Sequence, residues 1–311
     1  MTKIAVCPGI KPSWVHDAVV EGGGQLCDIA EAQGLVWTDA RNPNALVDLL
    51  ATNPRNLEWI QVPFAGVENF LQTGVFDARQ GSGARYLWTC GKGVYAEPVA
   101  ELALAVLLAG FRNVHRYAQA TSWQGPAGRN LQNAHVLILG GGGIAESLVR
   151  MLAPFDCTIT VLRKSGASMA GVDHVLGLES LDELLPQVDA VVVALSLTPE
   201  TENVIGAPQL SLMKGDAWVI NVGRGRHIDT DALVAALRAN EIGGAGMDVT
   251  DPEPLPDDHP LWHLENVIIT PHIGNTPEMG IPLLRARIVT NIRRFIAGEP
   301  LIGPIDLDSG Y

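Results

Sequence analysis

The sequence predicts an α/β protein with two parallel-sheet domains, one of which is inserted into the other. Apolar runs typical of strands alternate with helical patterns along nearly all of the 311 residues. Several runs are rich in Val, Ile and Leu, as strands buried on both faces of a parallel sheet are. Two long helical patterns, Glu97–Ala118 and Pro277–Ala297, lie where the chain would leave the first domain and return to it.

The first third of the chain has the pattern of a small α/β domain in its own right. Its apolar runs are short enough for strands, and two helical patterns lie between them. The expected strands are Ile4–Cys7, Gly34–Thr38, Trp59–Val62 and Arg85–Thr89, and the expected helices are Asp17–Ala32 and Pro43–Ala51.

The second domain begins with the helix Glu97–Ala118, in which Pro98 occupies the first turn, where proline is tolerated. The first half of this helix is apolar on nearly all sides, which fits a segment wedged between two domains. We expect residues 1–97 plus 286–311 to form one domain and residues 98–285 the other. The expected strands of the second domain are His135–Leu139, Thr158–Leu162, His174–Val175, Ala190–Leu195, Ala217–Val222, Gly244–Met247 and Val267–Thr270.

Composition argues against several classes of protein. A hydrophobic content of 47% with 18% charged residues is typical of a soluble globular protein. The net charge of −13 argues against nucleic acid as a main partner. No apolar run approaches the roughly 20 residues of a membrane helix, and no signal-peptide pattern follows Met1, so we expect a cytoplasmic protein with no membrane partner. The four cysteines lack metal-ligand spacing, and no metal site is expected.

A glycine-rich turn follows one of the apolar runs. The run Val136–Leu139 breaks into the glycines 140–143 and then opens a helix-like segment. Gly140 permits a tight turn, Gly142 lets backbone N–H groups approach a pyrophosphate, and the small Ala145 lets helix and strand pack closely. The helix N-terminus then faces the phosphates with its partial positive charge. This pattern predicts a Rossmann-like dinucleotide-binding domain.

Three polar side chains follow successive strands of this domain: Arg224, Glu253 and His272. Because ligands bind outside the carboxyl ends of strands in open α/β sheets, these groups can converge on one crevice. The set suits reduction of a 2-oxo acid. Arg224 would hold the carboxylate and polarise the ketone, His272 would protonate the carbonyl oxygen, and Glu253 would orient the imidazole and favour its cationic form. The other histidines are given no role, although His227 and His263 lie near these residues in sequence.

A series of motifs covers nearly the whole chain in order. It comprises Ala65–Glu68, Val99–Ala103, the glycine turn at 140–145, Leu197–Thr201, Met213–Ala217, Asn221–Gly225, Gly246–Val249, Asp251–Leu255 and Thr270–His272. The series resembles the D-isomer-specific 2-hydroxyacid dehydrogenase family, in particular its glyoxylate/hydroxypyruvate reductase-like members. An ordered set of this kind is far more specific than any single motif.

The resemblance implies a flavodoxin-like fold for the discontinuous substrate domain and a homodimer formed through the cofactor domain. It makes Arg224, Glu253 and His272 the catalytic trio and places Asp248 near the nicotinamide. The substrate-binding residues that it implies are Ala65, Gly66, Val67, Arg224 and His272. The expected cofactor-binding residues are Gly140, Gly142, Gly143, Ile144, Arg163, Lys164, Ser165, Ser196, Thr201, Val222 and Asp248.

Some departures from the family's pattern bear on the ligands. The acid that usually ends the second strand of the cofactor domain, and binds the ribose hydroxyls, falls at Arg163 here, and Lys164 and Ser165 follow. An acid would repel a 2′-phosphate, whereas Arg, Lys and Ser would accept it. We therefore predict NADP(H) in preference to NAD(H), which stays possible. Cys90 stands where many relatives carry Asn, and Ser196 where many carry Pro.

The sequence thus predicts an NADPH-dependent reductase of small 2-oxo acids, such as glyoxylate or hydroxypyruvate, that forms D-2-hydroxy acids. One alternative is an NAD-dependent D-2-hydroxyacid dehydrogenase with another substrate. Another is a dinucleotide-sensing, corepressor-like binding protein of the same fold, against which the intact Arg–Glu–His set argues. Formate dehydrogenases of similar fold pair the histidine with Gln, so Glu253 argues against that reaction.

Overall fold

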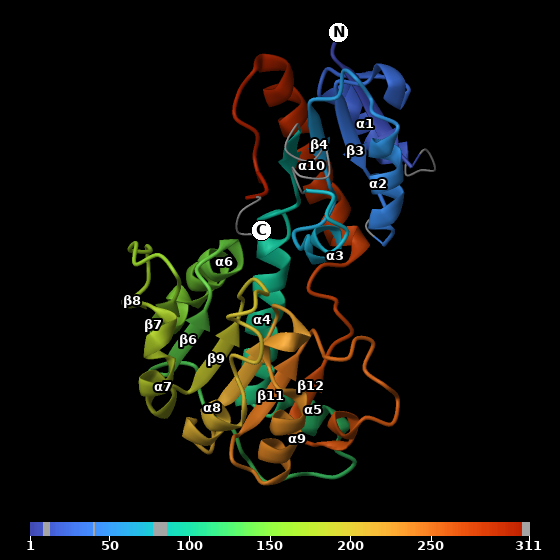
Figure 1. The fold of residues 1–311 in the computed structure, drawn as a ribbon. Coiled ribbons are helices and arrows are strands. Elements are labelled where there is room, and N and C mark those ends of the chain that lie inside the picture. The colour runs from blue at the N-terminus through green and yellow to red at the C-terminus, as the bar shows by residue number, and fades with distance from the viewer. Residues whose placement is uncertain (9–12, 40, 77–85, 307–311) are drawn as a thin grey trace. The chain divides into compact units, whose positions relative to one another are not determined.

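The computed structural model describes residues 1–8, 13–39, 41–76 and 86–306, and it contains two compact units (Figure 1). The first unit comprises Met1–Tyr95 and Thr276–Tyr311, and the second comprises Ala96–Asn275. The domain boundaries predicted from the sequence are 97/98 and 285/286. The second of these falls inside helix α10 (Pro277–Ala297), which the structure assigns whole to the first unit.

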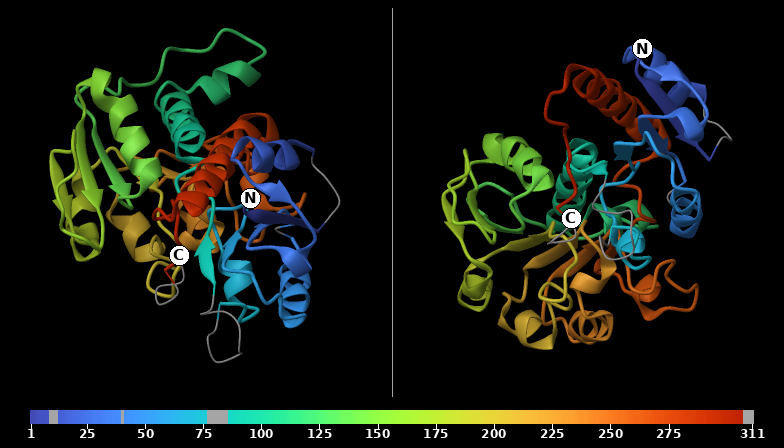
Figure 2. Two further views of the ribbon diagram at one scale, coloured as in Figure 1. Left: turned by 90° about the horizontal axis from the view of Figure 1, so that it is seen from above. Right: turned by 45° about the horizontal axis from the view of Figure 1, so that its top comes forward.

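The first unit is a parallel sheet with the strand order β2-β1-β3-β4-β5 and helices on both faces. Helices α1 and α10 pack side by side on one face (Figure 2), and α2 and α3 pack on the other. The four strands predicted for this unit are confirmed, although Arg85 lies outside the described residues. The elements are β1 (Lys3–Cys7), α1 (Ser13–Glu21), β2 (Gln25–Leu26), β3 (Gly34–Trp37), α2 (Pro43–Ala51), β4 (Trp59–Gln61), α3 (Glu68–Leu71) and β5 (Leu87–Thr89).

The predicted helix Asp17–Ala32 is wrong in its extent, because α1 ends at Glu21 before three consecutive glycines. Gly22 lies so close to α10 that a Cβ atom there would be 2.7 Å from the side chain of Ile292. Gly23 has a left-handed φ of +88°, which glycine adopts at little cost and which ends the helix. The chain then forms the edge strand β2 in place of a longer helix.

A buried polar network ties α10 to the sheet of the first unit. The Asn291 amide and the Thr89 hydroxyl each donate to Gln61 Oε1 over 2.9 Å. The Trp59 indole N–H donates to the Thr89 hydroxyl over 2.8 Å. These four side chains are at most 1% exposed. Because a buried polar group without a partner is costly, the network favours a single register of α10 on β4 and β5.

The second unit is a seven-stranded parallel sheet with the order β12-β11-β10-β9-β6-β7-β8. Helices α4 and α6 cover one face, and α7, α8 and α9 cover the other (Figures 1 and 2). All seven predicted strands are confirmed. The strands are β6 (His135–Leu139), β7 (Thr158–Leu162), β8 (His174–Leu176), β9 (Ala190–Val193), β10 (Trp218–Asn221), β11 (Gly244–Met247) and β12 (Val267–Ile269). The helices are α4 (Ala96–Phe111), α5 (Val114–Gln119), α6 (Gly143–Leu152), α7 (Leu181–Leu184), α8 (Ala207–Leu212) and α9 (Thr230–Arg238).

The single helix predicted at Glu97–Ala118 is wrong, because the segment forms two helices, α4 and α5. Asn113 lies between them with a left-handed φ of +52°, which breaks the helical path. Helix α4 packs on α6, β10 and β11 of its own unit. Gly110 of α4 is so close to the sheet that a Cβ atom would be 2.5 Å from the Trp218 indole. Much of the apolar surface of α4 is therefore covered within the second unit itself.

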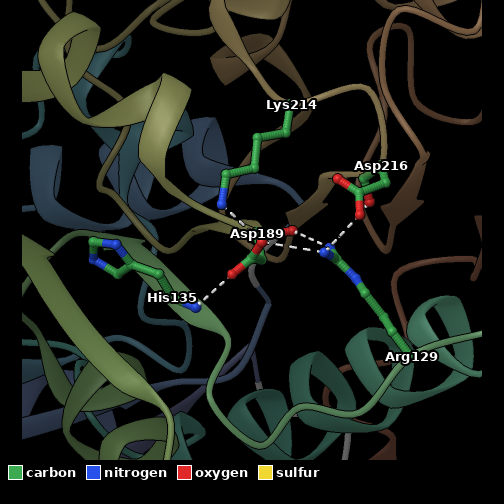
Figure 3. A network of polar contacts seen from close by, with 5 residues as sticks. All are labelled: Arg129, His135, Asp189, Lys214 and Asp216. Atoms are coloured by element: carbon green, nitrogen blue, oxygen red, sulfur yellow. Dashed lines mark hydrogen bonds and ion pairs between the residues drawn. The ribbon is translucent and has the colours of Figure 1, made fainter.

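A group of charged side chains joins the segments that lead into β6, β9 and β10 (Figure 3). The Asp189 carboxylate accepts hydrogen bonds from Lys214 Nζ (2.9 Å), Arg129 Nη1 (3.1 Å) and the backbone N–H of His135 (2.7 Å). Arg129 also donates to the Asp216 carboxylate over 3.0 Å. Burial raises the pKa of Asp189, but the bonds from His135 N–H and Lys214 outweigh it and hold the pKa below its usual value.

Replacing Asp189 with Asn should lower the free energy of unfolding at pH 7 by about 2 kcal/mol, since hydrogen bonds to charged groups contribute ~1.5–3 kcal/mol each. Because the native pKa of Asp189 is lowered, the stabilisation is complete above the unfolded value of about 3.9. It is lost as the pH falls below that value and through the native pKa. Urea unfolding at pH 7 and pH 3 measures both effects.

The difference in unfolding free energy between wild type and Asp189→Asn should narrow at pH 3. Asp257→Asn, which alters an exposed carboxylate of the same unit, is the control and should change stability little. A difference for Asp189→Asn that is absent at pH 7, or that widens at pH 3, would contradict this account.

Candidate active site

The three side chains singled out from the sequence lie on loops at the carboxyl ends of adjacent strands. Arg224 follows β10, Glu253 follows β11 and His272 follows β12. These strands are neighbours and pair in parallel, so their carboxyl ends lie at one edge of the sheet. This is the edge at which open α/β sheets bind their ligands.

His272 and Glu253 form a direct pair. Nδ1 of His272 lies 2.7 Å from Oε1 of Glu253, and the two side chains are 52% and 43% exposed. The carboxylate accepts the Nδ1 proton, and this fixes the orientation of the ring. Nε2 is then the ring nitrogen that can exchange a proton with a ligand.

A buried carboxylate holds the loop that carries His272. Asp248 directly follows β11 and is 5% exposed. Its Oδ1 accepts the Thr270 hydroxyl over 2.6 Å and the Ile273 N–H over 2.8 Å, and its Oδ2 accepts the Gly274 N–H over 2.9 Å. Its backbone C=O accepts the N–H of His272 over 2.8 Å. His272 has a left-handed φ of +53°, which costs on the order of 1 kcal/mol and is maintained by these bonds.

The backbone of Arg224 is held on both sides by buried side chains. Nδ2 of Asn221 donates to its C=O over 2.8 Å, and Nδ1 of His227 accepts its N–H over 3.0 Å. Asn221 and His227 are both 0% exposed. The guanidinium of Arg224 donates through Nη1 to the C=O of Gly223 over 2.8 Å. These bonds therefore hold the backbone that carries the Arg224 side chain in one conformation.

The loops after β10 and β11 touch each other. Gly225 lies so near the other loop that a Cβ atom there would be 2.0 Å from the carbonyl atoms of Thr250, so only glycine fits. Thr230 Oγ1 donates to the C=O of Asp251 over 2.8 Å. These contacts hold the segment of Arg224 against the loop that leads to Glu253.

The glycine turn has the conformation expected from the sequence. Gly140 has a φ of +110°, and a Cβ atom there would be 2.5 Å from the C=O of Ala194, so the position requires glycine. Helix α6 begins at Gly143 and Ile144, and nothing lies within 4 Å of a Cβ atom built on Gly142 before it. A phosphate can therefore approach the backbone N–H groups at the start of this helix, and the residues present fit a dinucleotide.

Arg163 lies against the same turn. It directly follows β7, and a Cβ atom on Gly141 would be 2.7 Å from its Cδ and Nε atoms. The stem of Arg163 thus crosses the glycine turn, and Lys164 and Ser165 follow it as exposed residues. The structure places a guanidinium beside the turn and puts an amine and a hydroxyl next to it along the chain.

The other expected cofactor residues lie near the ends of β9 and β10. Thr201 Oγ1 accepts the N–H of Thr198 over 2.8 Å and donates to the C=O of Ser196 over 2.8 Å. Thr201 therefore closes the loop after β9, whereas Ser196 is exposed. Val222 is 6% exposed and packs in the apolar cluster that also contains Ala145.

The loop Ala65–Val67 lies in the first unit, shortly after β4. Gly91 N–H donates to the C=O of Phe64 over 2.7 Å and so fixes the start of this loop. Ala65 is exposed and Val67 is buried. Cys90 is 0% exposed, and burial raises the pKa of its thiol. Its side chain therefore packs in the core of the first unit.

In residues 1–8, 13–39, 41–76 and 86–306, no three side chains of His, Cys, Asp or Glu are grouped as a metal site requires. None of the helices in these ranges has both the length and the apolar character needed to span a bilayer.

Comparison with known proteins identifies the family. Residues 102–274 match the profile described as D-isomer specific 2-hydroxyacid dehydrogenase, NAD binding domain. The chain belongs to the D-isomer specific 2-hydroxyacid dehydrogenase family. Members of this family are NAD(P)-dependent oxidoreductases. A glyoxylate/hydroxypyruvate reductase B of Yersinia pestis (strain Pestoides F) is 32% identical over 283 residues, which are 88% of this chain and 83% of that protein.

Further relatives of this 2-hydroxyacid dehydrogenase span almost the entire chain. The Corynebacterium melassecola protein called "Uncharacterized protein in proB 3'region" is 36% identical over 305 residues, 94% of this chain and 95% of that one. A D-isomer specific 2-hydroxyacid dehydrogenase from Xanthobacter autotrophicus Py2, solved in complex with NADPH and MES, is 26% identical with a TM-score of 0.82 and covers 100% of this chain and 99% of its own.

The NADPH-dependent glyoxylate/hydroxypyruvate reductase of Sinorhizobium meliloti, solved in complex with NADP and sulfate, is also similar, with a TM-score of 0.79. The likeness covers 100% of both chains at 22% identity, so it is a likeness of fold.

The structure brings two of the three predicted catalytic residues of this dehydrogenase into contact, Glu253 and His272, and places Arg224 on an adjoining loop. It adds Asn221 and His227, to which sequence reasoning assigned no role. Asn221 could have been singled out from the sequence, because it is a polar residue that ends an apolar buried strand. His227 could not, since its contact with Arg224 depends on the short 3₁₀ turn Gly225–His227.

Replacing Asp248 with Ala should release the loop that carries His272. The amides of Ile273 and Gly274 should exchange hydrogen at least about tenfold faster, since each loses a charge-assisted bond worth ~1.5–3 kcal/mol. Hydrogen exchange with peptide-level mass spectrometry measures this. Thr270→Val removes one bond to Asp248 and leaves the two amide bonds, so its effect should be smaller. Unchanged exchange in Asp248→Ala would show that the loop is held by other contacts.

Proposed function

We propose that this dehydrogenase is an NADPH-dependent reductase of small 2-oxo acids, with glyoxylate or hydroxypyruvate as substrate and D-2-hydroxy acids as products where the product carbon is chiral. The observation that carries the proposal is the His272–Glu253 pair on the loop beside Arg224, in the unit that also contains the dinucleotide turn. The name of the Yersinia pestis relative, a glyoxylate/hydroxypyruvate reductase, supports it.

In this proposal Arg224, His272 and Glu253 have different tasks. Arg224 binds the substrate carboxylate with two parallel N–H donors and polarises the carbonyl group. Bound NADPH would supply a hydride to the carbonyl carbon and be released as NADP⁺. Nε2 of His272 gives its proton to the carbonyl oxygen, so that C=O becomes CH–OH, and Glu253 stabilises the imidazolium before transfer. In the reverse direction, neutral His272 accepts the hydroxyl proton.

The cofactor preference rests on the position of Arg163. Its stem crosses the glycine turn, so its guanidinium lies near the end of β7, where the ribose of a dinucleotide binds in such sheets. No carboxylate occupies the segment Arg163–Ser165. Arg163 and Lys164 supply local positive charge to a chain with a net charge of −13, and this supports NADP(H) over NAD(H).

The remaining predicted site residues keep the roles that the family resemblance implies. The backbone at Ala65, Gly66 and Val67 would contribute to binding of the substrate carboxylate. Asp248 would act on the reaction by holding the His272 loop, in addition to its predicted place near the nicotinamide. The cytoplasmic location and the exclusion of nucleic acid remain predictions of the sequence.

We propose a homodimer formed through the second unit. Residues 120–128 are all exposed and have no helix or strand, and the Trp123 side chain is 101% exposed. A groove of about 710 Å³ lies beside this segment, between α5 and the segment from Leu261 to Ile269. A two-fold interface buries the same patch of both copies, so Trp123 of one copy and the groove of the other can cover each other.

The function is tested with purified protein and a panel of 2-oxo acids. NADPH oxidation with glyoxylate or hydroxypyruvate should have a kcat/KM about 10- to 100-fold above that with NADH, which corresponds to the ~1.5–3 kcal/mol of a charge-assisted bond. His272→Ala should lower kcat by about 10²–10⁴-fold while the dissociation constant of NADPH stays within about twofold. Equal kcat/KM values for the two cofactors would exclude the NADPH preference. Tight dinucleotide binding without turnover of any 2-oxo acid would favour a cofactor-sensing protein.

The assignment of Arg163 is tested by charge reversal. Arg163→Asp should lower kcat/KM with NADPH by about 100-fold and raise it with NADH, because the new carboxylate repels a 2′-phosphate and accepts ribose hydroxyls. The matched control is Arg238→Asp, which makes the same charge change at the end of α9 that points away from the site. If both variants change kcat/KM equally, the change comes from the overall charge of the protein and not from the position of Arg163.

The dimer is tested by sedimentation equilibrium. The wild type should have twice the mass of the 33.2 kDa chain at micromolar concentration. Trp123→Ser should raise the dimer dissociation constant at least about tenfold, because a large aromatic side chain at an interface contributes ~2 kcal/mol or more. A wild-type protein that sediments as a monomer throughout this range, or a variant that dimerises as strongly as the wild type, would rule out this interface.

A further inference from the structure

His227 is a fully buried residue that touches the backbone of Arg224. Its side chain is 0% exposed, and its Nδ1 atom accepts the N–H of Arg224 over 3.0 Å. The His227 main chain is bonded in turn, since its N–H donates to the C=O of Arg224 over 3.1 Å and its C=O accepts the Ile205 N–H over 3.1 Å. The ring is therefore attached to a segment with a defined position.

The hydrogen bond determines the protonation state of the ring. An imidazole nitrogen that accepts an N–H has an available lone pair and carries no proton. His227 must therefore be neutral with its proton on Nε2, because an imidazolium has no lone pair to offer at Nδ1.

The ring is held in this orientation by close packing. A Cβ atom on Gly223 would lie 2.9 Å from Nδ1 and 3.0 Å from Cε1 of His227, so a larger residue at 223 would displace the ring. Asn221 secures the other side of Arg224, because its Oδ1 accepts the Gly223 N–H over 3.1 Å and its Nδ2 donates to the Arg224 C=O over 2.8 Å. Both peptide groups of Arg224 are thus tied to buried side chains.

From this geometry we infer that His227 is a positioning residue for substrate binding. Its neutral ring fixes the peptide from which the Arg224 guanidinium extends, and so places that guanidinium for the substrate carboxylate. The inference rests on the proposed function of Arg224. It distinguishes the two histidines of the site, since His272 exchanges a proton with the substrate whereas His227 stays neutral and buried.

The kinetic test compares two replacements that differ in one acceptor. His227→Leu removes the acceptor and keeps most of the volume, whereas His227→Asn keeps an oxygen where Nδ1 lies. The KM for glyoxylate should rise about tenfold in His227→Leu, since displacement of a substrate-positioning group costs up to about 100-fold. In His227→Asn it should stay within about threefold of wild type, and the dissociation constant of NADPH should change less than about twofold in both.

The control is His135→Leu, because His135 lies at the start of β6, away from the carboxyl ends of the strands, and contacts Thr160. This replacement should leave the KM for glyoxylate unchanged. If His227→Leu leaves that KM unchanged, or if His227→Asn raises it as much as His227→Leu, the acceptor has no positioning role and the inference is wrong.

A second measurement is independent of turnover. In protein with ¹⁵N-labelled histidine, the resonances of His227 are assigned by their loss in His227→Asn. At pH 7 they should show an unprotonated Nδ1 and a protonated Nε2. A proton on Nδ1 would overturn the inference even if the enzyme is active. If His227 is in the Nε2–H form but the protein reduces no 2-oxo acid, the contact between His227 and Arg224 is supported and the proposed reaction is wrong.

Discussion

The parallel pairing of β10, β11 and β12 is the constraint on which the site depends. These strands are neighbours in register, so the loops that follow them begin at one edge of the sheet. A shift of one residue in either pairing would displace a loop by about 3.3 Å and turn its side chains to the other face. The parallel register therefore places the loops of Arg224, Glu253 and His272 at the same edge of the sheet, where His272 and Glu253 are in contact.

The loops at the carboxyl ends of β10, β11 and β12 contain exposed groups that can contact a ligand and buried groups that hold the loops in place. The pair His272–Glu253 is about half exposed, as groups that meet a ligand must be. The side chains that hold the loops, Asp248, Asn221 and His227, are at most 5% exposed. Buried polar groups must keep their partners, because breaking such a bond leaves a desolvated group behind. This cost keeps the exposed groups in place before a ligand arrives, which is the condition for efficient catalysis by positioning.

Much of the fold follows from the sequence, because buried parallel strands are continuous apolar runs and all the expected strands occur. The errors lie where local backbone geometry overrides helical periodicity, at Gly22–Gly24 and at Asn113. The positions of Arg224, Glu253 and His272 on the loops after β10, β11 and β12 were predictable, since each of these loops follows a recognisable strand. The contacts that hold these loops, such as Asp248 with Gly274 and His227 with Arg224, were not predictable, because no local pattern encodes them.

In the proposed reaction, Arg224 and His272 act on the same bound 2-oxo acid. A crystal structure with NADP⁺ and oxamate, an unreactive analogue of such an acid, shows whether they do. The oxamate carboxylate should lie against the Arg224 guanidinium, with the carbonyl oxygen within about 2.6–3.2 Å of Nε2 of His272. If oxamate binds elsewhere, with its carbonyl oxygen out of reach of His272, the proposed roles of both residues are wrong.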